Sequence, residues 1–216
     1  GTGIETTSAA QGVNFDLTGS GHASTMGWTT ANEGLLALDL NGNGRIDNGT
    51  ELFGVGTQLA NGQRAGNGYA ALAQYDTNGD GRIDTHDAVF NKLSVWVDAN
   101  HDGATEAGEL KSLAQLGITS LDLHDQVSGA ASHGNIIGLT SSYTTADGAQ
   151  HDMADVWFTK ATTPETTPTT ASAPALSDLL AAPPADLLPG HPTAHVAIGG
   201  HDDAAAGLHG LHGGMH

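Results

Sequence analysis

Three segments between Asp39 and Glu109 place oxygen-bearing side chains at the spacing of a calcium-binding loop. Calcium takes about six to eight oxygen ligands. A loop of the EF-hand type supplies them from positions 1, 3, 5, 7, 9 and 12, with Gly at position 6 for the turn. Position 7 contributes its backbone carbonyl, so it accepts any side chain. The spacing therefore predicts Ca²⁺ as the bound cofactor.

Two of the segments match this pattern throughout. The predicted ligands of the first are Asp76, Asn78, Asp80, Arg82, Asp84 and Asp87. Those of the second are Asp98, Asn100, Asp102, Ala104, Glu106 and Glu109. Asp87 is one methylene shorter than the Glu that usually closes such a loop, and Thr105 is polar where position 8 is usually apolar. We expect both segments to bind calcium.

The third segment follows the pattern as far as position 9. Its predicted ligands are Asp39, Asn41, Asn43, Arg45, Asp47 and Glu51. Position 12 is Thr50, and Glu51 comes one residue late. Either the loop is one residue longer and Glu51 closes it, or a water molecule does. A related segment from Asp16 to Gly21 has hydroxyl residues at positions 3 and 5, so we expect it to have lost its ion or to bind weakly.

The charge of the chain agrees with cation binding. It has 24 acidic residues against six basic ones, for a net charge of −18. Such a surface repels nucleic acid and anionic membranes, so neither is an expected partner. Without calcium the loop carboxylates repel one another and oppose folding, and bound ions remove that repulsion. The absence of cysteine excludes disulfides and thiolate metal sites.

The chain divides by composition near residue 160. Residues 1–160 are expected to form one calcium-binding domain, and 161–216 a Thr/Pro linker with a disordered, Leu- and His-rich tail. We predict an α+β fold, a small irregular domain of short helices and strands around EF-hand-like loops, ending in a β-hairpin. Helices are expected over 69–75, 86–93 and 109–116; strands over 13–17, 94–97 and 118–123; and the hairpin over 135–145 and 150–158.

Histidines cluster at the end of the tail. They are His191, His195, His201, His209, His212 and His216. Such a cluster could bind zinc, nickel or copper, which makes a metal carrier a further hypothesis. Irregular spacing in a segment expected to be disordered argues against it. No apolar run is long enough for a transmembrane helix, and residues 1–20 lack a secretory signal.

Several longer motifs resemble a known family. They include 3–7 (Gly-Ile-Glu-Thr-Thr), 33–39 (Glu-Gly-Leu-Leu-Ala-Leu-Asp), 47–54 (Asp-Asn-Gly-Thr-Glu-Leu-Phe-Gly), 68–73 (Gly-Tyr-Ala-Ala-Leu-Ala), 95–98 (Val-Trp-Val-Asp) and 153–158 (Met-Ala-Asp-Val-Trp-Phe). In this order they resemble the self-processing module of iron-regulated RTX (repeats-in-toxin) proteins over about residues 3–160.

The resemblance implies a secreted bacterial protein, exported by a type I system and folded on meeting external calcium. It places the protein outside the cell or at the cell surface. Such modules cleave an Asp-Pro bond just upstream through an aspartyl anhydride. Water opens the anhydride, or the amine of a Lys-bearing partner protein does, giving an isopeptide cross-link. The module itself supplies no separate nucleophile or base, so no catalytic residue is assigned.

One feature departs from that family. None of the seven prolines follows an Asp, so the chain contains no Asp-Pro bond. Either the chain starts just after such a bond, or it binds calcium without cleaving. The alternative function is therefore a non-catalytic structural or adhesion module.

Overall fold

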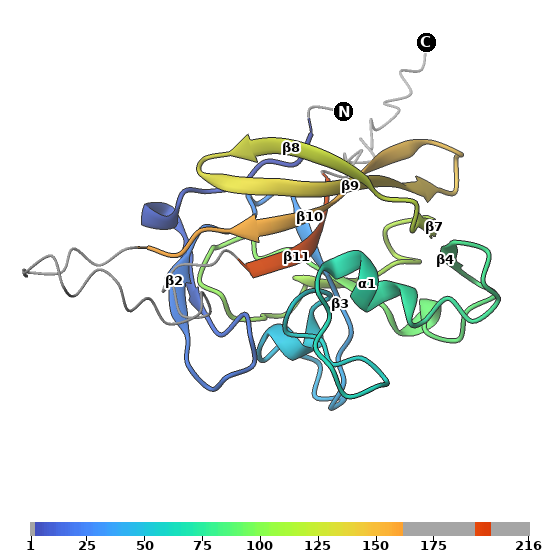
Figure 1. Cartoon of the computed structure of the whole chain (residues 1–216), viewed down its shortest axis with the longest axis horizontal. Helices are drawn as coiled ribbons and strands as arrows, with labels where there is room; N and C mark the ends of the chain where they lie inside the picture. Colours follow the sequence, from blue (N-terminus) through green and yellow to red (C-terminus); the bar gives the residue numbers. More distant parts are fainter. Residues whose placement is uncertain (1–2, 162–192, 200–216) are drawn as a thin grey trace, which may run out of the picture.

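The computed structural model describes residues 3–161 and 193–199 and is mostly β-sheet (Figure 1). A large antiparallel sheet has the strand order β4-β7-β9-β10-β11-β3-β5-β6, with β8 beside β9, and β1 and β2 form a separate pair. The strands are β1 Val13–Phe15, β2 Ser24–Met26, β3 Gly34–Ala37, β4 Arg82–Asp84, β5 Ser94–Trp96, β6 Leu110–Ser112, β7 Ile118–Asp122, β8 Gln126–Ser132, β9 Asn135–Thr145, β10 Gln150–Phe158 and β11 Thr193–Ile198. The helical elements are α1 Gly68–Ala73 and three 3₁₀ turns, η1 Ala9–Gln11, η2 Gly49–Glu51 and η3 Phe90–Lys92.

The predicted α+β fold with helices around the loops is therefore wrong. Only the helix expected over 69–75 forms, as α1, and the one expected over 86–93 shrinks to η3. Residues expected to start a helix at 109–116 instead form β6, which pairs with β5. β5 enters the loop at 98–109 and β6 leaves it, and the backbone N–H and carbonyl groups of these two strands hydrogen-bond to each other. This pairing takes the place of the predicted helix, which would be too short to be stable alone.

The predicted hairpin and three predicted strands are confirmed. β9 and β10 pair from Thr144–Gln150 at the turn to Ile136–Trp157 at the far end. Strands also form within the ranges expected at 13–17, 94–97 and 118–123. β8 was not predicted because six of its seven side chains are exposed and it lacks the alternation of a half-buried strand. In the described residues no helix is long and apolar enough to cross a membrane.

A strand from the predicted disordered tail lies in the middle of the large sheet. β11 pairs with β10 on one side and β3 on the other (Figure 1). The expectation of disorder is wrong for these residues, and the rest of the tail, including the other five histidines, lies outside the described residues. His195 is fully buried in this strand. It is thus withdrawn from the proposed metal-binding cluster.

The large sheet separates two apolar cores. One contains the Phe15, Trp28 and Trp96 rings, whose centroids lie 5.3 to 5.6 Å apart. The other packs α1 against the opposite face, with Leu72 and Tyr143 buried. Aromatic packing of this kind adds stability beyond the area it buries. The loops that carry the acidic residues extend from the edges of these two cores.

Two buried ionisable groups lie on the central strand pair. Burial raises the pKa of Asp155 to about 6, although Trp157 Nε1 and the Gly68 N–H both donate to its carboxylate at 3.1 Å. Burial also lowers the pKa of His195 to about 3, and the nearby backbone of Leu17 offsets only part of this effect. Burial therefore shifts the titration of both groups toward their neutral forms in the folded protein.

These two groups predict opposite effects of pH on stability. Acidification through pH 6 protonates Asp155 in the folded protein before the unfolded chain, so it raises the free energy of unfolding. Acidification below about pH 6.5 protonates His195 in the unfolded chain alone, so it lowers that free energy. Between pH 7 and 5 we expect Asp155→Asn to lose more stability than the unchanged chain, and His195→Leu to lose less. The difference reaches about 1.4 kcal/mol per pH unit at most.

Urea unfolding of the three chains at pH 5, 6 and 7, at one fixed calcium concentration, measures this difference. A pH slope that is the same for both variants contradicts the assignment of these groups.

Candidate metal centre

The first carboxylate of each predicted loop is held in the same way. One oxygen of the Asp at position 1 accepts the backbone N–H of the glycine at position 6. The donor–acceptor distances are 2.7 Å for Gly44 and Asp39, 2.9 Å for Gly81 and Asp76, and 2.9 Å for Gly103 and Asp98. All three glycines have φ between 72° and 78°, a conformation that L side chains rarely adopt. The turn glycine therefore both permits the bend and directs the carboxylate into the loop.

The closing carboxylate is also held in a shared way. Its two oxygens accept the backbone N–H groups of positions 2 and 9. The donors are Leu40 and Asp47 to Glu51 (3.0 and 2.8 Å), Thr77 and Asp84 to Asp87 (2.7 and 3.2 Å), and Ala99 and Glu106 to Glu109 (3.0 and 3.1 Å). Asp87 makes both bonds despite its shorter side chain. The three loops thus share one set of hydrogen bonds, from the glycine at position 6 to the first Asp and from positions 2 and 9 to the closing carboxylate. We call this set the hydrogen-bond frame.

This frame shows which residue closes the loop at 39–51. Glu51 makes the same pair of bonds as its counterparts, and it is buried. Thr50 instead donates both its N–H and its hydroxyl to Asn48 Oδ1, at 3.0 and 2.7 Å. In the hydrogen-bond pattern, Glu51 rather than Thr50 therefore occupies the position of the closing carboxylate, as in the first of the two possibilities left open by the sequence.

The middle residues of the loops point their polar groups at one another. The side chain at position 5 accepts the N–H of position 7 in each loop, namely Arg45, Arg82 and Ala104. The Asn at position 3 donates to a carboxylate, for example Asn41 to Asp47 at 2.8 Å and Asn100 to Glu106 at 3.0 Å. Within residues 3–161 and 193–199, no three His, Cys, Asp or Glu side chains are gathered as a metal centre.

The oxygen donors nevertheless fit a hard cation. Carboxylate, amide and carbonyl oxygens from one short loop are the ligands that calcium prefers, whereas zinc takes nitrogen and sulfur. In the loop at 39–51 the amides of Asn41 and Asn43 both donate to Asp47 Oδ2. The two amide N–H groups thus bond to a carboxylate oxygen that could otherwise contact an ion. The loop offers amide and carbonyl oxygens beside its carboxylates, so the carboxylates would not be the only ligand type.

Charge repulsion is clearest in the loop at 98–109. Burial raises the pKa of Asp98, and the charges of Glu109 and Asp102 add to the effect. Desolvation raises the pKa of Glu106 as well, with further contributions from Asp102 and Glu109. A cation in this loop would relieve the repulsion.

The other two loops stabilise their carboxylates with donors. Hydrogen bonds from Asn41 and Asn43 lower the pKa of Asp47. Burial acts to raise the pKa of Asp87, but bonds from the Thr77 N–H and hydroxyl outweigh it and lower the pKa. These two loops are therefore less dependent on an ion for charge compensation.

Two of the loops touch. The Ile46 N–H donates to Thr105 Oγ1 at 3.0 Å, and both residues occupy position 8 of their loops. This contact explains the polar residue at position 8 of the loop 98–109. The third loop is separate, because its position 8, Ile83, lies in β4 and pairs with Leu121 of β7.

The Asp16 segment has the same bond from the glycine N–H to the first Asp, and its own hydroxyls donate to that Asp as well. The Thr18 and Ser20 hydroxyls donate to Asp16 Oδ1 at 3.2 and 3.3 Å, and the Gly21 N–H donates to Oδ2 at 2.6 Å. Burial acts to raise the pKa of Asp16, yet these bonds outweigh it and lower the pKa. The backbone N–H groups of Ser20 and Gly21, together with the two hydroxyls, thus compensate the charge of this carboxylate.

The N-terminal segment is anchored beside β9. Buried Asn135 donates to Thr6 Oγ1 and to the Thr7 carbonyl, both at 2.8 Å, while its Oδ1 accepts the Thr159 N–H at 2.9 Å. The Thr6 N–H and hydroxyl also bond to Ser132. One side chain therefore ties the start of the described chain to the end of β10.

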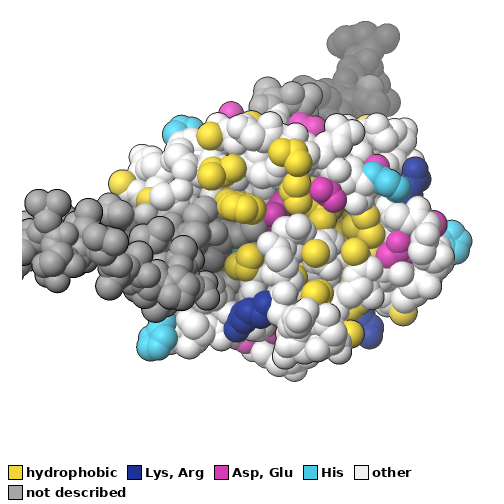
Figure 2. Space-filling view, viewed as in Figure 1, with side chains coloured by type: hydrophobic (Ala, Val, Ile, Leu, Met, Phe, Trp, Pro, Cys, Tyr) yellow, Lys and Arg dark blue, Asp and Glu magenta, His cyan; other side chains and the backbone are white. Residues whose placement is uncertain are grey.

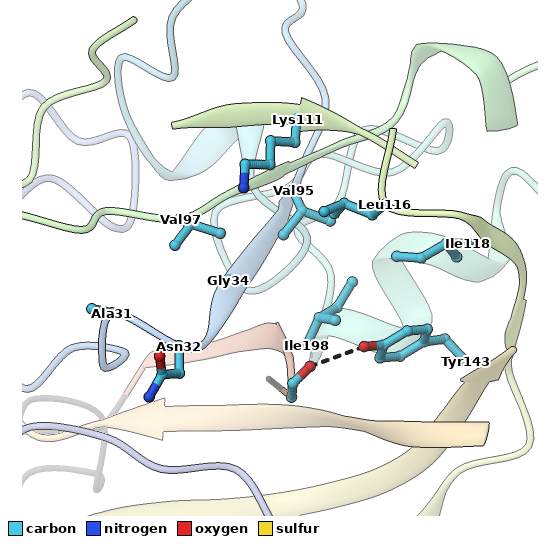
Figure 3. A pocket seen from close by; sticks show the side chains of 11 residues that line it. Ala31, Asn32, Gly34, Val95, Val97, Lys111, Leu116, Ile118, Tyr143 and Ile198 are labelled. Atoms are coloured by element: carbon cyan, nitrogen blue, oxygen red, sulfur yellow. Dashed lines mark hydrogen bonds between the residues drawn. The ribbon is translucent and has the colours of Figure 1, made fainter. Parts of the chain in front are cut away.

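A cavity of about 340 Å³ lies beside the end of β11 (Figure 3). Lys111 is the charged residue in its lining, which otherwise includes Val95, Ile118, Tyr143 and Ile198. Figure 2 shows apolar side chains gathered in patches on one face of the molecule. Val127 and Ile136 of the β8–β9 pair are exposed. The sequence patterns indicated neither feature.

Comparison with known proteins identifies the chain. The family model described as the SPM domain matches residues 1–159. The iron-regulated protein FrpA of Neisseria meningitidis serogroup C is 48% identical over 159 residues, which cover 72% of this chain and 14% of FrpA. The chain thus spans about one seventh of that relative's length. It belongs to the SPM domain family and is an FrpA-like module.

Proposed function

We propose that the loops at 39–51, 76–87 and 98–109 each bind a calcium ion and that binding completes the folding of the module. The observation that carries the proposal is the shared hydrogen-bond frame. Glu51 keeps its place in this frame even though its loop is one residue longer. A frame built by backbone N–H groups directs the carboxylates inward whether or not the surrounding elements are helices.

Calcium would supply charge neutralisation in these loops. Eleven of the 24 acidic residues lie between 39 and 109. Extracellular calcium modules work with dissociation constants of about 10⁻⁴–10⁻³ M, so a module of this kind is loaded only where calcium is abundant. Calcium at a hundredfold excess over the dissociation constant stabilises the folded state by about 2.7 kcal/mol per site. The loops therefore suit a module that folds after export.

We infer that the host is a secreted protein of the RTX type and that calcium-driven folding serves self-processing. The side-chain oxygen of an Asp would attack its own backbone carbonyl, and the bond to the Pro nitrogen would break as that nitrogen takes a proton. Water then opens the anhydride, or a Lys amine opens it to leave an isopeptide bond. Anchoring of residues 6 and 7 by Asn135 supports this proposal, because it fixes the backbone close to an upstream bond.

The second candidate is a non-catalytic structural or adhesion module. It is favoured by the Asp16 segment, whose carboxylate accepts hydrogen bonds from the Thr18 and Ser20 hydroxyls and so needs less compensation by an ion. Both candidates require calcium-dependent folding. They differ only in whether folding leads to cleavage.

A matched pair of variants tests the loop at 39–51. Glu51→Gln removes the closing charge and one acceptor of the frame, so we expect the affinity of one site to fall on the order of tenfold or more. Thr50→Ala removes the residue at the nominal twelfth position and leaves the affinity unchanged. Calcium titration of the full chain by calorimetry, with circular dichroism in parallel, measures both effects.

Fewer than two ions bound by the unchanged chain, or identical spectra with calcium and with chelator, contradicts the calcium proposal. A weaker Thr50→Ala variant beside a normal Glu51→Gln variant contradicts only the assignment of Glu51.

A second experiment tests self-processing. A short extension ending in Asp-Pro is joined upstream of Gly1, and calcium is added to the purified chain. We expect release of the extension, detected by mass spectrometry, with no release when Asn replaces the added Asp. Asn135→Ala should slow the release while the chain still binds calcium, since only the anchor is lost. An extended chain that stays intact in saturating calcium supports the non-catalytic module.

A further inference from the structure

β11 closes a gap in the large sheet. Along one edge it pairs with β10 over six residues, from Met153–Ile198 to Phe158–Thr193. Along the other edge it pairs with Leu35 and Gly34 of β3, and the Val196 N–H donates to the Phe53 carbonyl at 3.0 Å. Without this strand, β3 and β10 would each present an unpaired edge to the gap.

The side chains of β11 complete both apolar cores. Val196 and Ile198 are buried with α1 on one face of the sheet, and Ala197 is buried with the aromatic cluster on the other. The fit around Val196 is close, because a Cβ placed on Gly68 would lie 2.3 Å from its Cγ2 atom. The strand that fills this gap therefore presents apolar side chains to both cores over residues 196–198, next to the buried His195.

The end of the strand is also specified. The Gly199 N–H donates to the Asp152 carbonyl, and its own carbonyl accepts the Tyr143 hydroxyl, both at 2.9 Å (Figure 3). A Cβ at Gly199 would lie 3.1 Å from the Asp152 oxygen and 3.3 Å from Ile4 Cδ1. A small residue is therefore needed where the strand meets the N-terminal segment.

The strand comes from outside the family region. The SPM domain match ends at residue 159, and β11 begins at Thr193, after the Thr- and Pro-containing residues 162–192. In the described residues the gap has no other strand between β3 and β10. The family module alone thus holds a groove that some other segment must fill.

We propose that residues 3–161 form a strand acceptor, and that residues 193–199 are a separable peptide ligand of it. The groove between β3 and β10 takes an extended peptide by strand addition, with backbone bonds on both edges. Its preferred ligand is apolar at the positions of residues 196–198, small at the Ala197 position, and glycine at the Gly199 position. The same groove accepts this segment from a second copy of the chain when the covalent link is lost. The proposal goes beyond calcium binding, because it concerns the segment that the folded module accepts.

The link through 162–192 sets the competition between the two sources. A covalent link gives an effective concentration of about the millimolar range, so the chain's own strand excludes free peptide while the link is intact. Cutting the link removes this advantage. A peptide added in excess then exchanges with the bound strand.

The experiment uses the full chain with a specific protease site inserted between Ser172 and Ala173. The chain is cut in a buffer in which the intact protein is folded, and the products are passed over a size-exclusion column. We expect the C-terminal fragment to co-elute with the rest. A tenfold excess of a fluorescent peptide covering residues 190–202 should then replace most of the bound fragment, as measured by anisotropy.

Two control peptides test the specificity without altering the acceptor. An Ala197→Asp peptide, which places a charge against the buried aromatic core, should exchange at least tenfold more weakly. An Asp202→Ala peptide, changed outside the strand, should exchange as well as the unchanged one. Separation or aggregation of the cut chain, absence of exchange, or equal exchange by the Ala197→Asp peptide overturns the proposal.

Discussion

The closing carboxylate of each acidic loop bridges two backbone N–H groups, and much of the fold depends on that bridge. It fixes the two ends of a loop relative to each other. In the loops at 39–51 and 98–109 the residue before the first Asp also donates to the carbonyl of the closing Glu, at 2.8 Å from Leu38 and 2.9 Å from Val97. Each of these two loops therefore joins two antiparallel segments in a fixed register and acts as a turn between them.

This arrangement couples charge to the central strands. The strands that enter these two loops are β3 and β5, which pair with each other. β3 also forms one wall of the groove that holds β11. Repulsion among the carboxylates at 98–109 therefore acts against strands whose side chains, such as Trp96, are fully buried. A cation that relieves the repulsion stabilises the loop and, through it, the sheet.

The turns of the acidic loops are easier to recognise from sequence than the fold around them, while ion binding by these loops stays a prediction. Short acidic and amide side chains with a glycine at fixed spacing depend on local geometry, so they can be recognised without tertiary contacts. The closing residue at Glu51 could not be chosen, because spacing alone does not show which carbonyl or N–H a side chain meets. The segment from Leu110 was mistaken for a helix because its leucines have helical spacing, while its pairing with β5 is a non-local contact. β11 was missed for a related reason, since a short apolar run gains its order only from two strands far away in sequence.

The boundary of the family region and the boundary of the folded unit do not coincide. The SPM domain match ends at residue 159, yet the sheet described by the structure includes residues 193–198. Homology follows the loops and the hairpin, whose side chains carry recognisable patterns. The filling strand meets the groove through backbone bonds and buried apolar side chains, neither of which forms a recognisable sequence motif. A module of this construction therefore relies on a segment outside the family match to complete its core.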